Sequence, residues 1–308
     1  MKNSITIGGI DWIHMANPSA KEVEELDSRY NLHELVYDDL IELNSQDKID
    51  VYDDYLSIAL HFPKFDPKSQ RYILNELNVV LSKDYIITAT RLLTNHIEWL
   101  RNKYQKEIKE FEDDEQYKIT TYFMLYQIID NLYDKTMRIL DKFYKDLVIM
   151  EEDLFAKNQI NSKSINNILI KKRNISYLKH IYSTQWDVIN ELQEILPKFY
   201  EDELSVYFED LHTKRQKIIS NIINLQENVD SIADTYSNLM TVNTNNTILI
   251  LTVFTGLMLP LTFLTWLYGM NVPLPWKDSP FVFWAIILLM TCVWWYFGYI
   301  FYRDKIIK

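Results

Sequence analysis

The stretch that decides the fold is "LTWLYGMNVPLPW", which runs from Leu264 to Trp276. A long apolar run ends here at Gly-Met-Asn (269–271), two prolines follow, and a second apolar run begins soon afterwards. The two runs, 247–268 and 281–302, hold 22 residues each and no charged residue. A helix needs about 20 apolar residues to cross a bilayer. The sequence therefore predicts two membrane-spanning helices, with an asparagine at the outer end of the first.

The residues that flank these runs predict the orientation of the chain in the membrane. The C-terminal tail carries Arg303, Lys305 and Lys308, whereas the loop between the runs carries one Lys and one Asp. The positive-inside rule places such a tail in the cytoplasm, and two spans return the N-terminal body to the same side. We expect a multi-pass protein of the plasma or inner membrane with both termini cytoplasmic. Aromatic residues at the run ends fit the interfacial belts of membrane proteins: Trp266, Tyr268, Trp276, Trp294, Trp295, Tyr299 and Tyr302.

Charge is unevenly distributed along the chain. The region from Ile248 onward has four basic and two acidic residues, a net charge of +2, while the whole chain carries −11, so residues 1–247 carry −13. This acidity argues against a nucleic-acid partner, which requires clustered Lys and Arg. It suits a soluble body that attracts cations, although acidity that serves only solubility is the alternative interpretation.

The scarcity of glycine predicts long helices. The chain has five glycines, and none lies between Gly9 and Gly256. Apolar residues at helical spacing predict two antiparallel helices over about 113–156 and 162–196, with Pro197 ending the second. A third helical segment begins near Leu204 and continues without a breaker into the first apolar run. If helical throughout, its roughly 65 residues span about 100 Å.

The first hundred residues have a mixed pattern. "DWIHMA" (11–16) reads as a strand, and Ser19 is a candidate N-cap for a helix that is followed by a second short helix in "HELVYDDLIEL" (33–43). Alternating apolar residues predict strands within 50–62 and 77–91. We expect an α/β cytoplasmic part over 1–105, a long-helix cytoplasmic part with the stalk over 106–246, and a two-helix transmembrane domain over 247–308.

No motif points to an enzyme. The chain has no P-loop, no G-x-S-x-G and no H-E-x-x-H, and its six histidines form no i, i+4 pair. The single cysteine, Cys292, excludes a disulfide framework and favours a reducing compartment. The first thirty residues lack the pattern of a signal peptide. We expect neither catalytic residues nor an organic cofactor.

Four segments together resemble the CorA family of divalent-cation transporters, and the resemblance covers essentially the whole chain. They are "PLTFLTWLYGMN" (260–271), "TNNTILILT" (244–252), "YFEDL" (207–211) and "HELVYDDL" (33–40). The resemblance implies a funnel-shaped cytoplasmic domain and a homopentamer whose first spans line one axial pore. It also implies a selectivity filter at Gly269, Met270 and Asn271, further polar rings at Asn245 and Thr262, and a hydrophobic constriction at Ile248, Leu251 and Leu259.

The same resemblance implies regulation from inside the cell. Asp39 and Asp210, with Asp38 beside them, match acidic residues that bind a regulatory Mg²⁺ between neighbouring cytoplasmic domains. Without the resemblance they would be three solvated acids among many. The implied function is a channel for hydrated divalent cations, Mg²⁺ foremost and also Co²⁺ and Ni²⁺. Membrane potential would drive it and cytoplasmic Mg²⁺ would gate it.

Two departures from the family pattern keep alternatives open. Trp266 stands where the resemblance predicts a small residue, and the loop lacks the glutamate often found beyond the tripeptide. A Zn²⁺ transporter of the ZntB kind is one alternative, although "VPLPW" lacks the glycine-rich loop typical of that branch. A membrane-anchored sensor or scaffold is another, and the polar residues along the first span favour a pore over it. Ion preference and the choice between passive and proton-coupled transport stay open.

Overall fold

The structure is a computed structural model that describes residues 2–42, 46–92, 95–112, 119–157, 162–199, 205–271 and 279–303. The chain forms two compact units, Met1–Ala233 and Asp234–Lys308, and each is described by itself. The expected boundaries at 105/106 and 246/247 stay predictions. They fall inside helices Asn95–Glu112 and Ser205–Gly269, because no Gly or Pro near either boundary interrupts the helix.

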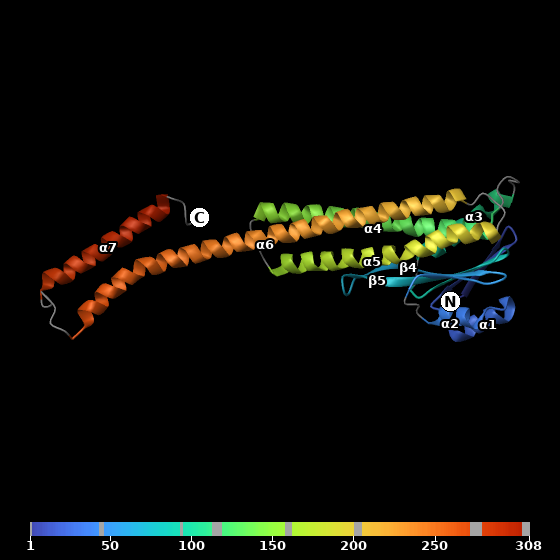
Figure 1. Ribbon diagram of the computed structural model, residues 1–308, viewed down its shortest axis with the longest axis horizontal. Coiled ribbons are helices and arrows are strands. Elements are labelled where there is room, and N and C mark those ends of the chain that lie inside the picture. The colour runs from blue at the N-terminus through green and yellow to red at the C-terminus, as the bar shows by residue number, and fades with distance from the viewer. Residues whose placement is uncertain are drawn as a thin grey trace. The chain divides into compact units, whose positions relative to one another are not determined.

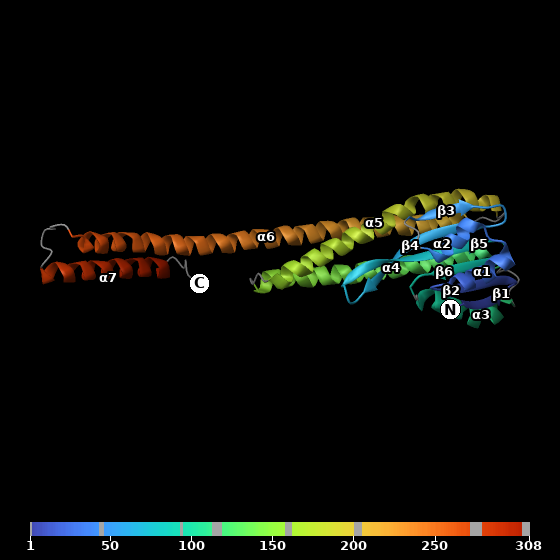
Figure 2. The same cartoon turned by 90° about the horizontal axis from the view of Figure 1, so that it is seen from below.

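A six-stranded sheet with the order β1-β2-β6-β5-β4-β3 forms the centre of the first unit. Figure 2 looks onto this sheet, with β1 and β3 at its opposite edges. β2 and β6 pair in parallel, and the other neighbouring strands are antiparallel. The expected strands correspond to β2, β4, β5 and β6. The strands are Lys2–Ile7 (β1), Ile10–Ala16 (β2), Lys48–Val51 (β3), Leu56–Asp66 (β4), Arg71–Leu81 (β5) and Tyr85–Thr90 (β6).

The hairpin of β1 and β2 was not among the sequence-based predictions. Gly8 and Gly9 adopt φ angles of 54° and 86° in its turn. Residues with a Cβ rarely adopt such positive angles, so the two adjacent glycines make this tight reversal possible. The Gly-Gly pair was the available signal for an additional edge strand.

Helices α1 (Ala20–Tyr30) and α2 (Glu34–Ile41) cover one face of the sheet (Figure 1). Ser19 caps α1 as the sequence predicts: its hydroxyl accepts a hydrogen bond from the Glu22 backbone N–H at 3.4 Å, and the Glu22 carboxylate accepts one from the Ser19 N–H at 3.0 Å. The two helices and the sheet share a buried apolar cluster: Ile13, Met15, Val23, Leu26, Leu32, Val36, Leu40, Tyr55, Val80, Ile87 and Ala89.

Long helices cover the opposite face of the sheet. They are α3 (Asn95–Glu112), α4 (Thr121–Lys157) and α5 (Ser162–Phe199), and the first part of α6 (Ser205–Gly269) runs along α4 and α5 (Figure 1). The expected helix pair is thus confirmed in α4 and α5. Pro197 does not end α5 directly but lies inside its last turn.

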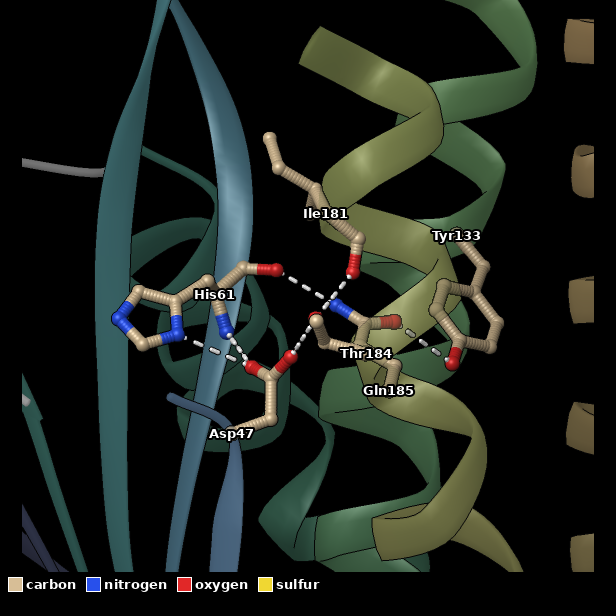
Figure 3. Close-up of polar contacts among 6 residues, drawn as sticks. All are labelled: Asp47, His61, Tyr133, Ile181, Thr184 and Gln185. Atoms are coloured by element: carbon tan, nitrogen blue, oxygen red, sulfur yellow. Dashed lines mark hydrogen bonds and ion pairs between the residues drawn. The ribbon is translucent and has the colours of Figure 1, made fainter. Parts of the chain in front are cut away.

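A buried polar junction joins the sheet to α5 (Figure 3). The Asp47 side chain, fully buried, lies 2.7 Å from the backbone N and 3.0 Å from Nδ1 of His61 in β4. It also accepts a hydrogen bond from the Thr184 hydroxyl of α5. The neighbouring Gln185 donates to the His61 carbonyl and accepts from the Tyr133 hydroxyl at 3.0 Å. Asp47 directly precedes β3, so this junction fixes the start of that strand against α5.

The second unit contains the C-terminal part of α6 and helix α7 (Pro280–Arg303). Among the described residues, Val206–Gly269 includes a stretch that is long and apolar enough to cross a membrane, and it is almost wholly unburied within the chain. The apolar segment Pro280–Tyr296 of α7 is shorter by the same measure. The two expected spans thus coincide with the end of α6 and with α7.

Candidate functional site

The predicted pore residues all lie on one face of α6. Asn245, Ile248, Leu251, Leu259 and Thr262 follow one another at intervals of three, three, eight and three residues. At 3.6 residues per turn these intervals keep a side chain near one direction. All five are exposed in the single chain, and Leu259 is 64% exposed. We call this the exposed stripe of α6.

The other face of α6 packs towards α7. Val253, Leu257, Leu261, Leu264 and Tyr268 recur at intervals of three and four, and all five are less exposed than the stripe. Leu264 and Tyr268 line an open groove together with residues at the start of α7, among them Phe281 and Val282. From Val253 onward burial thus distinguishes two sides of the same helix, and among the described residues it is the side of Leu264 and Tyr268 that lines a groove with α7.

Two threonines on this side of α6, Thr262 of the exposed stripe and the neighbouring Thr255, form hydrogen bonds to backbone carbonyls of the same helix. Thr262 donates its hydroxyl proton to the Met258 carbonyl at 2.8 Å, and Thr255 donates to the Leu251 carbonyl at 2.8 Å. A hydroxyl that has donated its proton keeps its oxygen lone pairs as acceptors. Such oxygens can accept hydrogen bonds from water.

The predicted selectivity filter sits where α6 ends. Gly269 is the last helical residue, and the Met270 N–H donates to the Leu267 carbonyl at 3.4 Å. Met270 and Asn271 are exposed. The rest of the loop, including Pro273, Pro275 and the Lys277-Asp278 pair, lies outside the described residues, as does the basic tail from 304 onward.

Asp39, on α2, has an internal counter-ion. Its Oδ2 lies 2.6 Å from Nζ of Lys48 on β3, and its side chain is only 14% exposed. Lys48 also lies 3.2 Å from a carboxylate oxygen of Asp50. Asp38 is exposed, and its backbone carbonyl accepts the N–H of Glu42 at the end of α2. Of the two neighbouring aspartates, Asp39 is therefore the one built into an ion pair.

Asp210, on α6, has a comparable arrangement. It accepts a hydrogen bond from the Tyr126 hydroxyl at 2.9 Å and lies 3.8 Å from Nζ of Lys214, one helical turn away. Lys214 also pairs with Asp130 and with Asp134 on α4. Burial, followed by the hydrogen bond to Asp210, raises the pKa of Tyr126 well above its ordinary value, so the phenol stays a donor. One lysine thus faces three carboxylates.

A single chain does not bring the three predicted regulatory aspartates together. Asp38 and Asp39 belong to α2 on one face of the sheet, and Asp210 belongs to α6, which packs with the helices of the other face (Figure 1). Among the described residues, no group of three or more His, Cys, Asp or Glu side chains is placed to hold a metal ion. An ion shared by these residues would need a second subunit.

Two functional candidates were missed in the sequence, Lys48 and Lys214. Lys214 follows Asp210 by four residues, a spacing at which helical side chains meet, so the sequence held a usable signal. Lys48 follows Asp39 by nine residues across a chain reversal, and only the folded sheet places the two side chains in contact.

The continuation of α6 into a long apolar segment and the apolar α7 define the class: a membrane protein with an acidic α/β unit before its apolar helices. Comparisons with known proteins give the family. The sequence profile described as CorA-like Mg²⁺ transporter protein matches residues 8–303. The chain belongs to the CorA family of divalent-cation transporters, which is a family of transporters and not of enzymes.

Relatives and solved structures agree with this assignment. The cobalt/magnesium transport protein CorA of Thermotoga maritima is 22% identical over 263 residues, which cover 84% of this chain and 72% of that protein. The complete structure of the CorA magnesium transporter from Methanocaldococcus jannaschii matches with a TM-score of 0.81 at 21% identity, over 97% of this chain and 92% of that one. The latter match confirms the CorA-like fold.

Proposed function

We propose that this protein is a homopentameric channel for hydrated Mg²⁺, with both termini in the cytoplasm and with Asn271 at the outer mouth. The observation that carries the proposal is the exposed stripe of α6. It combines Asn245 and Thr262 with the apolar Ile248, Leu251 and Leu259 on one exposed face, which near the helix end lies opposite the groove that Leu264 and Tyr268 line with α7. Polar residues inside a membrane generally face a bundle interior or a water-filled path.

The chemistry of the filter suits an ion that keeps its water. Mg²⁺ dehydrates reluctantly and is usually bound with several waters in place. Five amide oxygens from Asn271 would accept hydrogen bonds from those waters without replacing them. A neutral amide also avoids the cost of a charge at the membrane surface and the tight binding that would slow conduction. An inside-negative potential of 100 mV favours entry of a divalent ion by about 4.6 kcal/mol.

Gating would combine a hydrophobic constriction with the acidic residues of the first unit. Rings of Ile248, Leu251 and Leu259 would form a narrow apolar path that can dewet and stop conduction. A divalent ion between Asp39 of one subunit and Asp210 of the next would cancel their repulsion and favour the closed state. Loss of that ion at low internal Mg²⁺ would favour opening.

Uptake of Mg²⁺ into liposomes that contain the purified protein tests the transport function. We expect uptake that an inside-negative potential accelerates and that Asn271→Ala strongly reduces. Absence of uptake by the intact protein would support a membrane-anchored scaffold instead. Competition by Zn²⁺, or a dependence on a proton gradient, would support a zinc transporter.

The same liposomes test the gate. Asp210→Ala should weaken inhibition by Mg²⁺ on the cytoplasmic side, because one of the two facing carboxylates is lost. Asp187→Ala, on α5, serves as a control acid. Inhibition that Asp210→Ala leaves unchanged would contradict the proposed regulatory site.

A further inference from the structure

Trp266 shares the direction of the exposed stripe of α6. It lies 18 residues beyond Ile248, which corresponds to about five full turns of an α-helix, and α6 is helical over the whole interval. It is 75% exposed, compared with 54% for Ile248 and 64% for Leu259. A large aromatic side chain thus continues the stripe to within one turn of the helix end at Gly269.

The neighbours of Trp266 fix this direction independently. Leu264 and Tyr268, two residues before and after it, line the groove against α7. A displacement of two residues turns a helical side chain by about 200°. Trp266 therefore points away from α7 and is not held by contacts within the described chain.

This face carries hydroxyl groups beside its apolar residues. Thr255 and Thr262 lie eleven and four residues before Trp266, close to three turns and one turn of the helix, and both are exposed. Hydroxyls within a membrane segment generally face other helices or a water-filled path. The alternative placement of Trp266 is the interfacial belt that the sequence pattern suggests.

We propose that Trp266 lines the ion path as an aromatic collar just inside the Asn271 mouth and helps to determine which cations pass. This inference rests on the proposed pore and adds to it a specificity-determining residue. The indole offers an electron-rich face that attracts cations and a single N–H donor, and it has no acceptor atom that could replace a water ligand. The collar therefore favours a cation that crosses with its hydration shell intact, as Mg²⁺ does.

Cysteine accessibility in the full-length protein in liposomes tests the collar. The background is Cys292→Ser, which removes the one native cysteine. Trp266→Cys is the test variant, Thr262→Cys is the positive control for the pore, and Leu264→Cys is the matched control on the α7 side. Each variant is treated with a positively charged, water-soluble methanethiosulfonate, and Mg²⁺ uptake is measured before and after treatment.

We expect the reagent to reduce uptake about tenfold in the Trp266 and Thr262 variants, because a fixed positive charge in a narrow pore opposes a divalent cation. The Leu264 variant should keep its uptake. If the reagent blocks only the Thr262 variant, the result supports the proposed pore and contradicts the proposed position of Trp266 in it. If neither is blocked, the proposed pore fails, and the collar fails with it.

A second pair of variants covers the case in which Trp266→Cys is inactive. Trp266→His would converge several imidazoles on the axis, and imidazole nitrogens are ligands that Zn²⁺ prefers. We expect micromolar Zn²⁺ to block Mg²⁺ uptake in this variant, with recovery after a chelator is added. Leu264→His should gain no such block. Equal responses of the two variants to Zn²⁺ would overturn the proposal.

Discussion

At the scale of single residues, lysines form ion pairs with two of the predicted regulatory acids, Asp39 and Asp210. Burial by itself lowers the pKa of Lys48, but the hydrogen bond and charge of Asp39, followed by those of Asp50, raise it above the ordinary value. Burial also lowers the pKa of Lys214 by itself. The hydrogen bond to Asp130 and the charges of Asp130, Asp134 and Asp210 raise this pKa above the ordinary value. Both ammonium groups therefore stay charged at neutral pH and neutralise part of the acidity without a metal.

Replacement of Lys48 should strengthen the regulatory response. In Lys48→Met, Asp39 loses its counter-ion at 2.6 Å, so a divalent cation would bind without displacing an ammonium group. We expect half-inhibition of uptake at an internal Mg²⁺ concentration up to about fivefold lower, because partly exposed ion pairs are worth about 1 kcal/mol or less. The exposed Lys21→Met is the matched control. A weaker response to Mg²⁺ in Lys48→Met would show that Lys48 supports ion binding.

His14 should make stability depend on pH. Burial, with the charge of Arg101 as the next cause, lowers the pKa of His14 from 6.5 to about 4. The unfolded chain then binds more protons between these values, so the free energy of unfolding falls as pH drops from about 6.5 to about 4, by about 3 kcal/mol. Below pH 4 this contribution no longer changes. Urea unfolding of His14→Gln, followed by circular dichroism, should show a correspondingly shallower pH dependence than the parent, and equal slopes would contradict the assignment.

At the scale of elements, local sequence signals account for most of the helix and strand boundaries. Ser19 begins α1 through a reciprocal capping box, and Gly8-Gly9 reverses the chain between β1 and β2. Long glycine-free segments form α4, α5 and α6 up to Gly256. In α6, the intervals of three and four residues also separate the exposed stripe from the side towards α7.

The cap of α1 can be tested without disturbing the core. Ser19→Ala removes the side-chain acceptor for the Glu22 N–H, and we expect a loss of about 1 kcal/mol in the free energy of unfolding. Ser28→Ala in the same helix is the control, because Ser28 only donates back to the Glu24 carbonyl, a contact that does not support the helix. Equal losses in the two variants, measured by urea unfolding, would show that the cap does not stabilise α1.

At the scale of the whole molecule, buried polar contacts connect the sheet to the helix that leads into the membrane. Asp47 binds β4 through His61 and α5 through Thr184. Arg215 on α6 in turn donates to the Tyr182 carbonyl of α5 at 2.6 Å, and its side chain is buried. Lys48 therefore follows a residue that is fixed to α5, and α5 is fixed to the first part of α6.

Loss of this junction should destabilise the first unit. Asp47→Ala removes the buried carboxylate that accepts from the His61 backbone N–H, whereas the Thr184 hydroxyl keeps the Ile181 carbonyl as an acceptor. We expect a loss of about 3 kcal/mol in the free energy of unfolding. Asp47→Asn, which keeps an acceptor oxygen, should lose less. Asp66→Ala, in an exposed turn, should have no comparable effect. An unfolding curve of Asp47→Ala that coincides with the parent would contradict a structural role for the junction.

The sequence by itself determined the apolar helices, the helical body and the family, because these follow from local composition, periodicity and a short motif. It also determined that the predicted pore residues share one face of α6, since that depends only on helical spacing. Only the tertiary structure decided that Lys48 meets Asp39, that Asp47 is buried against α5, and that α7 covers the face of α6 opposite to Trp266. These are contacts between segments distant in the chain, and such contacts depend on how the sheet and helices pack, which no local pattern encodes.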